Sequence, residues 1–172
     1  MMHSKNSLFK EFISGGISGA ISNPMSPEAQ LHAYKYYEEI RHRKDDIYKI
    51  SQYTGYTPEQ ILQVKNFLFI ETHLLSSGIH RFDPCFEIAE SWQRLSDMQD
   101  YVQEHDKLLI PHELMEIDLI NEGMSQEKAH VKTSEVYDYP RASDKFYKKL
   151  QTQKKKVISK EEVPQKDMEM EI

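Results

Sequence analysis

The chain has 172 residues, of which 38% are hydrophobic and 29% are charged, a composition that predicts a soluble protein with one moderate core. The formal net charge of −6 is mild and negative, so the chain as a whole is not expected to bind polyanions. The single cysteine, Cys85, excludes an intrachain disulfide and fits a reducing compartment, so we predict a cytoplasmic protein.

Composition also divides the chain into three parts. The apolar stretch 12–22 is rich in glycine and too short to span a bilayer, so residues 1–24 are predicted to be a flexible lead-in without a membrane anchor. Residues 25–155 are predicted to form one α-helical domain. Seven lysines without an acid occupy positions 145–160, and five acids follow by residue 171, so residues 156–172 are predicted to be a disordered charged tail.

The first helix is predicted to run from Ser26 to about Gln52. Ser26, Pro27 and Glu28 are typical of a helix start, and Gly55 is typical of a helix end. Apolar residues follow the 3.6-residue period and are expected to face the core: Leu31, Tyr34, Ile40, Ile47 and Ile50.

Two further helices are predicted before residue 100. Thr57 to Gln60 has the pattern of a capping box, and the second helix should continue past Leu74 to the turn signal at residues 76–78. Asp83 and Pro84 are expected to cap the third helix, which buries Trp92.

The remaining helices are predicted from residue 106 onward. Asp106 should cap a fourth helix that contains Pro111 in its first turns and ends at Gly123. Ser125 should cap a fifth helix that Pro140 closes, and a last helix is expected to begin at Ser143 and Asp144. The predicted class is all-α, a compact bundle of five to six helices.

The stretch 105–130 gathers more metal-ligating and proton-accepting groups than any other part of the chain. His112 and Glu116 are four residues apart and share one helix face, and Glu113 lies between them. This HExxE pattern has a glutamate where the HExxH of zinc proteases has its second histidine. Glu116 could still ligate a metal, and His130 on the next helix would have to supply a third ligand. Such a site requires a divalent metal, with Glu113 activating water.

The sequence also allows two interpretations of these residues that need no metal. In one, His112 is a general base that Glu116 orients, and His105 or His130 is the acid, as in cleavage of RNA next to a ribose 2′-hydroxyl. In the other, the histidines and acids only form pairs on helix surfaces. Supporting candidates outside the cluster are His73, Asp83, Arg94 and Asp106.

The acidic charge around this stretch does not favour binding of a nucleic acid. Residues 83–122 contain eleven acids and two basic residues, so a phosphate backbone would need the basic segment 41–44 and the lysine run to hold it. Ser51, Gly55 and Ile61 have the spacing of a helix-turn-helix, but the second helix begins with Pro58 and Glu59, which does not favour DNA binding.

Several motifs in order resemble a known module: ISGAISNPMSPEAQLHAYKYYEEIR, TGYTPEQI, RFDPCFEIAESWQRL, HDKLLIPHELMEIDLINEGMSQEKAH and VYDY. Over residues 17–150 the chain resembles the C-terminal module of Gram-positive phage minor head proteins of the head-morphogenesis type, and it is similar to the tips of Leu-X-Gly polymorphic toxins.

The resemblance implies an exchangeable effector domain, hydrolytic and often nuclease-like, with a possible RNA substrate and a cognate immunity protein as partner. By motif position it points to His73, Asp83, Arg94, His105, Asp106, His112, Glu113, Glu116 and His130. The chain departs from such proteins in two respects, because it has only a short lead-in and because Pro111 stands beside His112. The alternative is a phage- or toxin-associated interaction domain without catalysis. The oligomeric state is left open.

Overall fold

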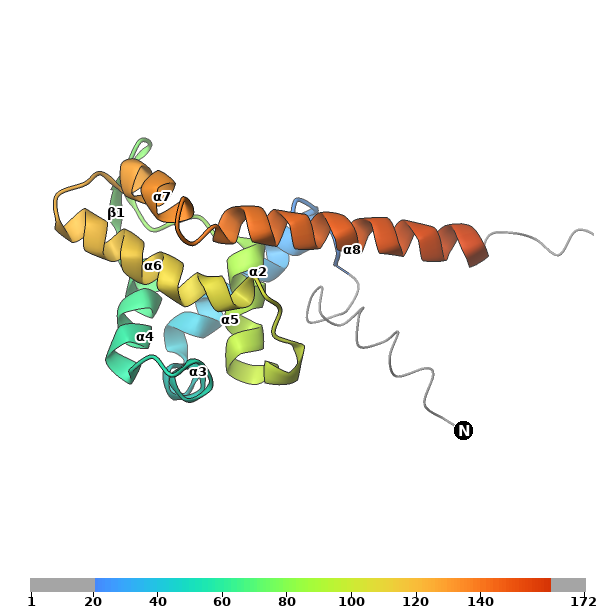
Figure 1. The fold of residues 1–172 in the computed structure, drawn as a ribbon, viewed down its shortest axis with the longest axis horizontal. Coiled ribbons are helices and arrows are strands. Elements are labelled where there is room, and N and C mark those ends of the chain that lie inside the picture. Colours follow the sequence, from blue (N-terminus) through green and yellow to red (C-terminus); the bar gives the residue numbers. More distant parts are fainter. Residues whose placement is uncertain (1–20, 162–172) are drawn as a thin grey trace, which may run out of the picture.

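A computed structural model describes residues 21–161, and within them the protein is mostly α-helical (Figure 1). The predicted all-α class is therefore confirmed. The predicted lead-in up to residue 20 and the tail from residue 162 lie outside the described residues. The elements are α2 (Pro27–His42), α3 (Asp46–Thr54), α4 (Pro58–Lys65), the π-helix η1 (Asn66–Ile70), β1 (His73–Leu75), β2 (Gly78–His80), α5 (Phe86–Asp97), the 3-10 helix η2 (Gln99–Tyr101), α6 (Asp106–Asn121), α7 (Gln126–Ser134) and α8 (Tyr139–Glu161).

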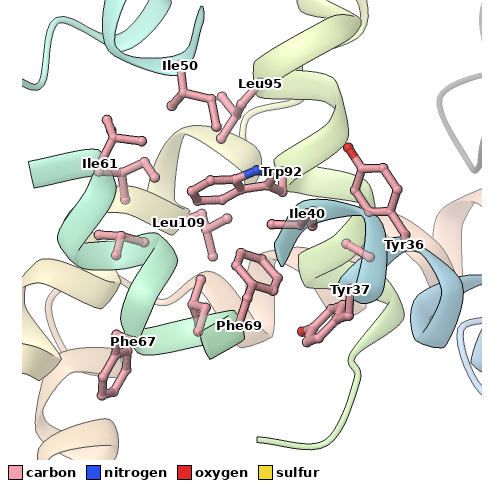
Figure 2. Close-up of a cluster of buried hydrophobic side chains, with 14 of the residues drawn as sticks. Tyr36, Tyr37, Ile40, Ile50, Ile61, Phe67, Phe69, Trp92, Leu95 and Leu109 are labelled. Atoms are coloured by element: carbon pink, nitrogen blue, oxygen red, sulfur yellow. The ribbon is translucent and has the colours of Figure 1, made fainter. Parts of the chain in front are cut away.

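The main core lies where α2, α3, α4, η1, α5 and α6 meet. Figure 2 shows Trp92 of α5 among aliphatic side chains from the neighbouring helices, and its ring packs edge-to-face with Phe69 at a centroid distance of 5.1 Å. Trp92 is completely buried, and truncation of such a residue to alanine costs about 3–5 kcal/mol. A smaller cluster, with Phe86, Tyr147 and Leu150, joins α8 to α2 and α5.

The first predicted helix is in fact two helices, and the prediction of one continuous helix to residue 52 is wrong. The chain becomes extended at Arg43, between α2 and α3. Lys65 stabilises the break because its Nζ donates to the Arg43 carbonyl at 2.6 Å and pairs with the buried Asp46 carboxylate at 2.9 Å. Trp92 Nε1 donates to the other Asp46 oxygen at 3.1 Å. These partners come from distant helices, so local periodicity could not reveal the break.

Two residues predicted to face the core on this helix are exposed instead. Leu31 is 55% and Tyr34 is 61% exposed, whereas Ile40 and Ile50 are fully buried as expected. The break between α2 and α3 changes which face of each helix packs inward.

The second predicted helix is shorter than expected. α4 begins with the predicted capping box of Thr57 and Gln60, but it passes into η1 and then into an antiparallel hairpin. Leu74 pairs with Ile79 across this hairpin and is 79% exposed, so its predicted place in the core is wrong. The turn signal at residues 76–78 is the hairpin turn, in which Gly78 has a φ of +122°.

Two predicted caps are also absent. α5 begins at Phe86, and neither Asp83 nor Cys85 caps it by a side-chain hydrogen bond. Asp106 is the first residue of α6 rather than its cap, because its carboxylate instead accepts hydrogen bonds from Arg94, Ser91 and the Gln103 amide.

The last part of the chain begins as predicted and then differs. Ser125 caps α7 as expected, but α7 ends at Ser134, and Pro140 lies in the first turn of α8. Residues 156–161 continue α8 as a helix where disorder was predicted, and Figure 1 shows this end of α8 extending away from the other helices. Lysine is a good helix former, and a helix anchored by buried Tyr147 and Leu150 can propagate through a lysine run. None of the helices in residues 21–161 has the length and apolar character needed to cross a membrane.

Candidate metal centre

Helices α6 and α7 bring together three side chains that can ligate a metal. His112 and Glu116 are one turn apart on α6, which continues through Pro111 without a break. Gly123 has a φ of +101° and reverses the chain, so that α7 packs back against α6 and places His130 beside Glu116. His112 and Glu116 are buried, whereas the side chain of His130 is 44% exposed.

The donor atoms of the three side chains form a small triangle. His112 Nε2 lies 3.3 Å from Glu116 Oε2, His130 Nδ1 lies 2.9 Å from the same oxygen, and the two nitrogens are 3.4 Å apart. All of the potential ligand atoms lie within 4.8 Å of one another. In a tetrahedral zinc site with bonds of about 2.0–2.1 Å, two ligand atoms are separated by about 3.3–3.4 Å. The triangle thus has nearly the size of one face of such a tetrahedron.

Neighbouring groups hold two members of the triangle in orientation. His112 Nδ1 lies 2.7 Å from the Tyr137 carbonyl and must donate to it, which leaves Nε2 to face Glu116. Gln126 Nε2 donates to Glu116 Oε1 at 2.9 Å, so that Oε2 faces the two histidines. Metal-binding histidines and carboxylates commonly have such outer partners.

The carboxylate of Glu116 is ionised over the physiological range. Burial opposes ionisation, but hydrogen bonds from His112, His130 and Gln126 outweigh it and lower the pKa of Glu116 to about 2. The hydrogen bond to Glu116 in turn raises the pKa of His130 above its ordinary value. The cluster therefore holds a fixed negative charge that attracts a proton or a cation.

A pocket of about 230 Å³ adjoins the triangle. Glu113, Glu116, Gln126, His130 and Asp83 supply its polar wall, and its remaining lining is mainly apolar. Burial and the nearby charge of Glu116 raise the pKa of Glu113 well above its ordinary value. Two members of the triangle, Glu116 and His130, therefore border this pocket.

Cys85 also lines this pocket but is no nucleophile at neutral pH. Its burial and the charge of Glu87 raise the pKa of its thiol to about 12. It acts as a small apolar wall residue, as a lone cysteine without a neighbouring base usually does.

The structure does not bring His105, Arg94 and Asp106 into the triangle. They form a separate buried cluster at the start of α6, in which Arg94 donates to both oxygens of Asp106 at 2.7 and 2.8 Å. His105 Nε2 lies 3.2 Å from Asp106 Oδ1. Burial lowers the pKa of His105 to about 4, so this histidine is neutral at physiological pH.

His73 and Asp83 lie beside the pocket rather than in the triangle. The His73 ring stacks on Phe82 at a centroid distance of 4.2 Å, and its Nε2 bonds the Phe67 carbonyl at 2.7 Å. His73 therefore supports the pocket wall formed by Phe67 and Phe82, while Asp83 is exposed at the rim.

Sequence reasoning missed two partners of the triangle. Nothing in the sequence distinguishes Gln126 except its place after the Ser125 cap. The other partner is the backbone carbonyl of Tyr137, and a backbone group cannot be recognised from residue type. The one sequence signal near that carbonyl is the VYDY motif, which contains Tyr137.

Searches with protein-family profiles, among curated proteins and among solved structures give no match for this chain, so the site is interpreted from its own geometry.

Proposed function

We propose that the protein is a metal-dependent hydrolase of the bacterial effector type, in which His112, Glu116 and His130 hold one divalent transition metal. The observation that carries this proposal is the triangle of three donor atoms, separated by 2.9, 3.3 and 3.4 Å. Two imidazole nitrogens and one carboxylate oxygen suit zinc or iron(II) better than magnesium or calcium, which prefer oxygen ligands.

The proton balance of the triangle also favours a cation. Because His112 Nδ1 lies against the Tyr137 carbonyl, its Nε2 is the nitrogen that faces Glu116 and His130. The Glu116 carboxylate, 3.3 Å from this nitrogen, attracts a proton or a metal ion to the space between the three donors. One metal ion would satisfy all three donors together, whereas one proton satisfies only one contact.

Glu116 and His130 line the pocket, so a metal held by the triangle would border it. Zinc supplies Lewis acidity and lowers the pKa of water, which is the chemistry that hydrolysis needs. Glu113 is the proposed proton-transfer group because its carboxyl lines the same pocket as Glu116 and His130. His105 has no part in this scheme, since its ring is buried beside Arg94 and Asp106.

The substrate is proposed from the resemblance to phage and toxin modules. A nuclease-like activity on RNA is the leading candidate, and an immunity protein would be its cognate partner in a producing cell. The alternative of an interaction domain without catalysis predicts neither metal binding nor cleavage, so the following two experiments separate these possibilities.

The first experiment measures metal content. Wild-type protein purified with zinc should retain about one zinc per chain by elemental analysis, and His130→Ala should lose it. His42→Ala is the matched control because His42 is exposed on α2 and, within residues 21–161, its ring bonds the backbone carbonyl of Glu38 and no side chain of the triangle. Wild-type protein that binds zinc no better than His130→Ala would overturn the metal site.

The second experiment measures hydrolysis. Induced expression of wild-type protein in bacteria should arrest growth with cleavage of total RNA, and His112→Ala should relieve both effects. Glu113→Gln should keep the metal but lose cleavage, which separates proton transfer from metal binding. Harmless wild-type expression together with intact RNA would count against the nuclease.

A further inference from the structure

A second cleft lies next to the metal pocket and, unlike that pocket, is lined by two arginines. It measures about 760 Å³ and runs between α2 and the β1–β2 hairpin, where Arg41, Arg81, His80, Ser77, Thr72 and Tyr34 line it. We call it the arginine groove. Phe82 and Asp83 line both the groove and the metal pocket, so that the two cavities are neighbours.

Two arginines of the groove are anchored side by side on the end of the π-helix. Arg41 Nε donates to the Phe69 carbonyl at 2.6 Å, and Arg81 Nε donates to the next carbonyl, that of Ile70, at 2.9 Å. These carbonyls are free because the chain leaves η1 at Glu71 in an extended conformation. The helix end therefore holds two guanidinium groups from distant parts of the sequence at neighbouring carbonyls, and both line the same groove.

Anchoring through Nε leaves the terminal nitrogens of Arg81 available. Arg41 Nη1 pairs with the exposed Glu38, whereas nothing in residues 21–161 engages the terminal nitrogens of Arg81. A guanidinium group held in this way presents a planar fork of donors, which matches the oxygens of a phosphate group. The groove thus has a preformed position for an anion.

The rest of the groove adds features that suit a nucleotide. Tyr34 is 61% exposed on its wall, although tyrosine is a large ring with apolar faces. Ser77 Oγ lies 2.6 Å from His80 Nε2, and His80 Nδ1 lies 2.7 Å from the Arg81 carbonyl, so this part of the wall is fixed by its own hydrogen bonds. Exposed aromatic rings beside arginines are the usual means of binding unpaired bases and their phosphates.

We propose that the arginine groove binds the backbone of a single-stranded nucleic acid, with Arg81 and Arg41 at a phosphate and Tyr34 stacked on a base. This inference rests on the proposed function in one respect: a neighbouring linkage of the strand would then reach the metal pocket past Phe82 and Asp83. The groove supplies the positive charge that the acidic metal pocket lacks. It does so with Arg41 and Arg81, without the lysines of α8.

Binding of a fluorescent single-stranded RNA of ten nucleotides, followed by anisotropy with and without EDTA, tests this inference. Arg81→Ala should weaken binding at least tenfold and reduce the salt dependence by about one phosphate contact. Tyr34→Ala should weaken binding at least fivefold because one base loses its stacking partner. Arg81→Lys keeps the charge without the fork and should fall between wild type and Arg81→Ala.

Lys156→Ala is the matched control, since it removes one exposed positive charge from α8, outside the groove. It should leave the affinity within twofold of wild type. Equal losses for Lys156→Ala and Arg81→Ala would overturn the groove, as would wild-type affinity in Arg81→Ala.

The EDTA arm separates the groove from the metal site. Binding that persists in EDTA and depends on Arg81 supports the groove even if the protein holds no metal. Binding that EDTA abolishes would place the strand on the metal alone and overturn the inference. Competition by poly-glutamate at equal charge concentration would also overturn it, because it would identify an acidic peptide as the ligand.

Discussion

Helix α6 carries two clusters of ionisable side chains, one in its first turn and one further along. In the first, Arg94 meets His105 and Asp106, and every member is at most 3% exposed. In the second, His112 and Glu116 meet His130, whose side chain is 44% exposed. Both clusters join a histidine to a carboxylate at 3.2–3.3 Å, so residue type and spacing do not distinguish them.

The difference lies in how each negative charge is balanced. The Asp106 carboxylate accepts from Arg94, Ser91 and the Gln103 amide, so its bonding capacity is met inside the protein. The Glu116 carboxylate faces the ring nitrogens of two histidines, of which His130 is partly exposed, and it borders a pocket. A cluster that is closed off from solvent stabilises the fold, whereas one that borders a pocket can also bind a ligand. Three predictions test this distinction.

The largest expected effect is on stability, at the first cluster. Arg94→Ala should lower the free energy of unfolding by about 3–5 kcal/mol, because it leaves the Asp106 charge buried without its main partner. Urea unfolding measures this loss. The double variant Arg94→Met/Asp106→Leu should recover part of it, since the Asp106 charge is gone while the buried Glu90 still lacks its contact with Arg94. A loss below about 1 kcal/mol in Arg94→Ala would show that the cluster does not stabilise the fold.

The next effect concerns pH. The native pKa of His105 is about 4, against an ordinary value of 6.5, because its ring is buried. Below pH 6.5 the unfolded chain therefore binds a proton that the folded chain does not. The contribution of His105 to the free energy of unfolding should fall as the pH drops from 6.5 to 4, by about 3 kcal/mol.

Urea midpoints at pH 7, 6 and 5 measure this dependence. His105→Phe should remove the His105 contribution in that range, because the phenyl ring can keep the contact with Phe146 but cannot bind a proton. The raised pKa values of Glu113 and His130 and the lowered pKa of Glu116 act in both proteins, so the difference between wild type and variant measures His105. An unchanged pH profile in His105→Phe would assign the dependence to other groups.

The smallest effect is expected at the second cluster. Gln126→Ala should weaken zinc binding about tenfold to hundredfold, because the carboxylate of Glu116 loses the group that orients it. The unfolding free energy without metal should change by about 1 kcal/mol or less. Zinc titration of this variant beside Gln63→Ala, an exposed glutamine on α4, measures the difference. Equal zinc affinity in the two variants would remove Gln126 from the site.

The local sequence predicted where most helices begin and end, but it did not predict how the helices pack together. The caps at Ser26, Thr57 and Ser125 and the glycine ends at Gly55 and Gly123 are all where the sequence places them. Such signals depend on hydrogen bonds between residues a few positions apart, so they can be recognised from the local sequence. The break at Arg43 and the hairpin at Leu74 were missed because the first depends on Lys65 and the second on strand pairing.

The sequence by itself determined that this chain is α-helical and that His112, Glu116 and His130 are available on two adjacent helices. The tertiary structure alone decided that these three meet, that His105 instead joins Arg94 and Asp106, and that Arg41 lies beside Arg81 on the end of η1. The physical reason is the range of the forces involved. Helix formation depends on neighbours within four residues, whereas the environment of a charge depends on whichever helices fold around it.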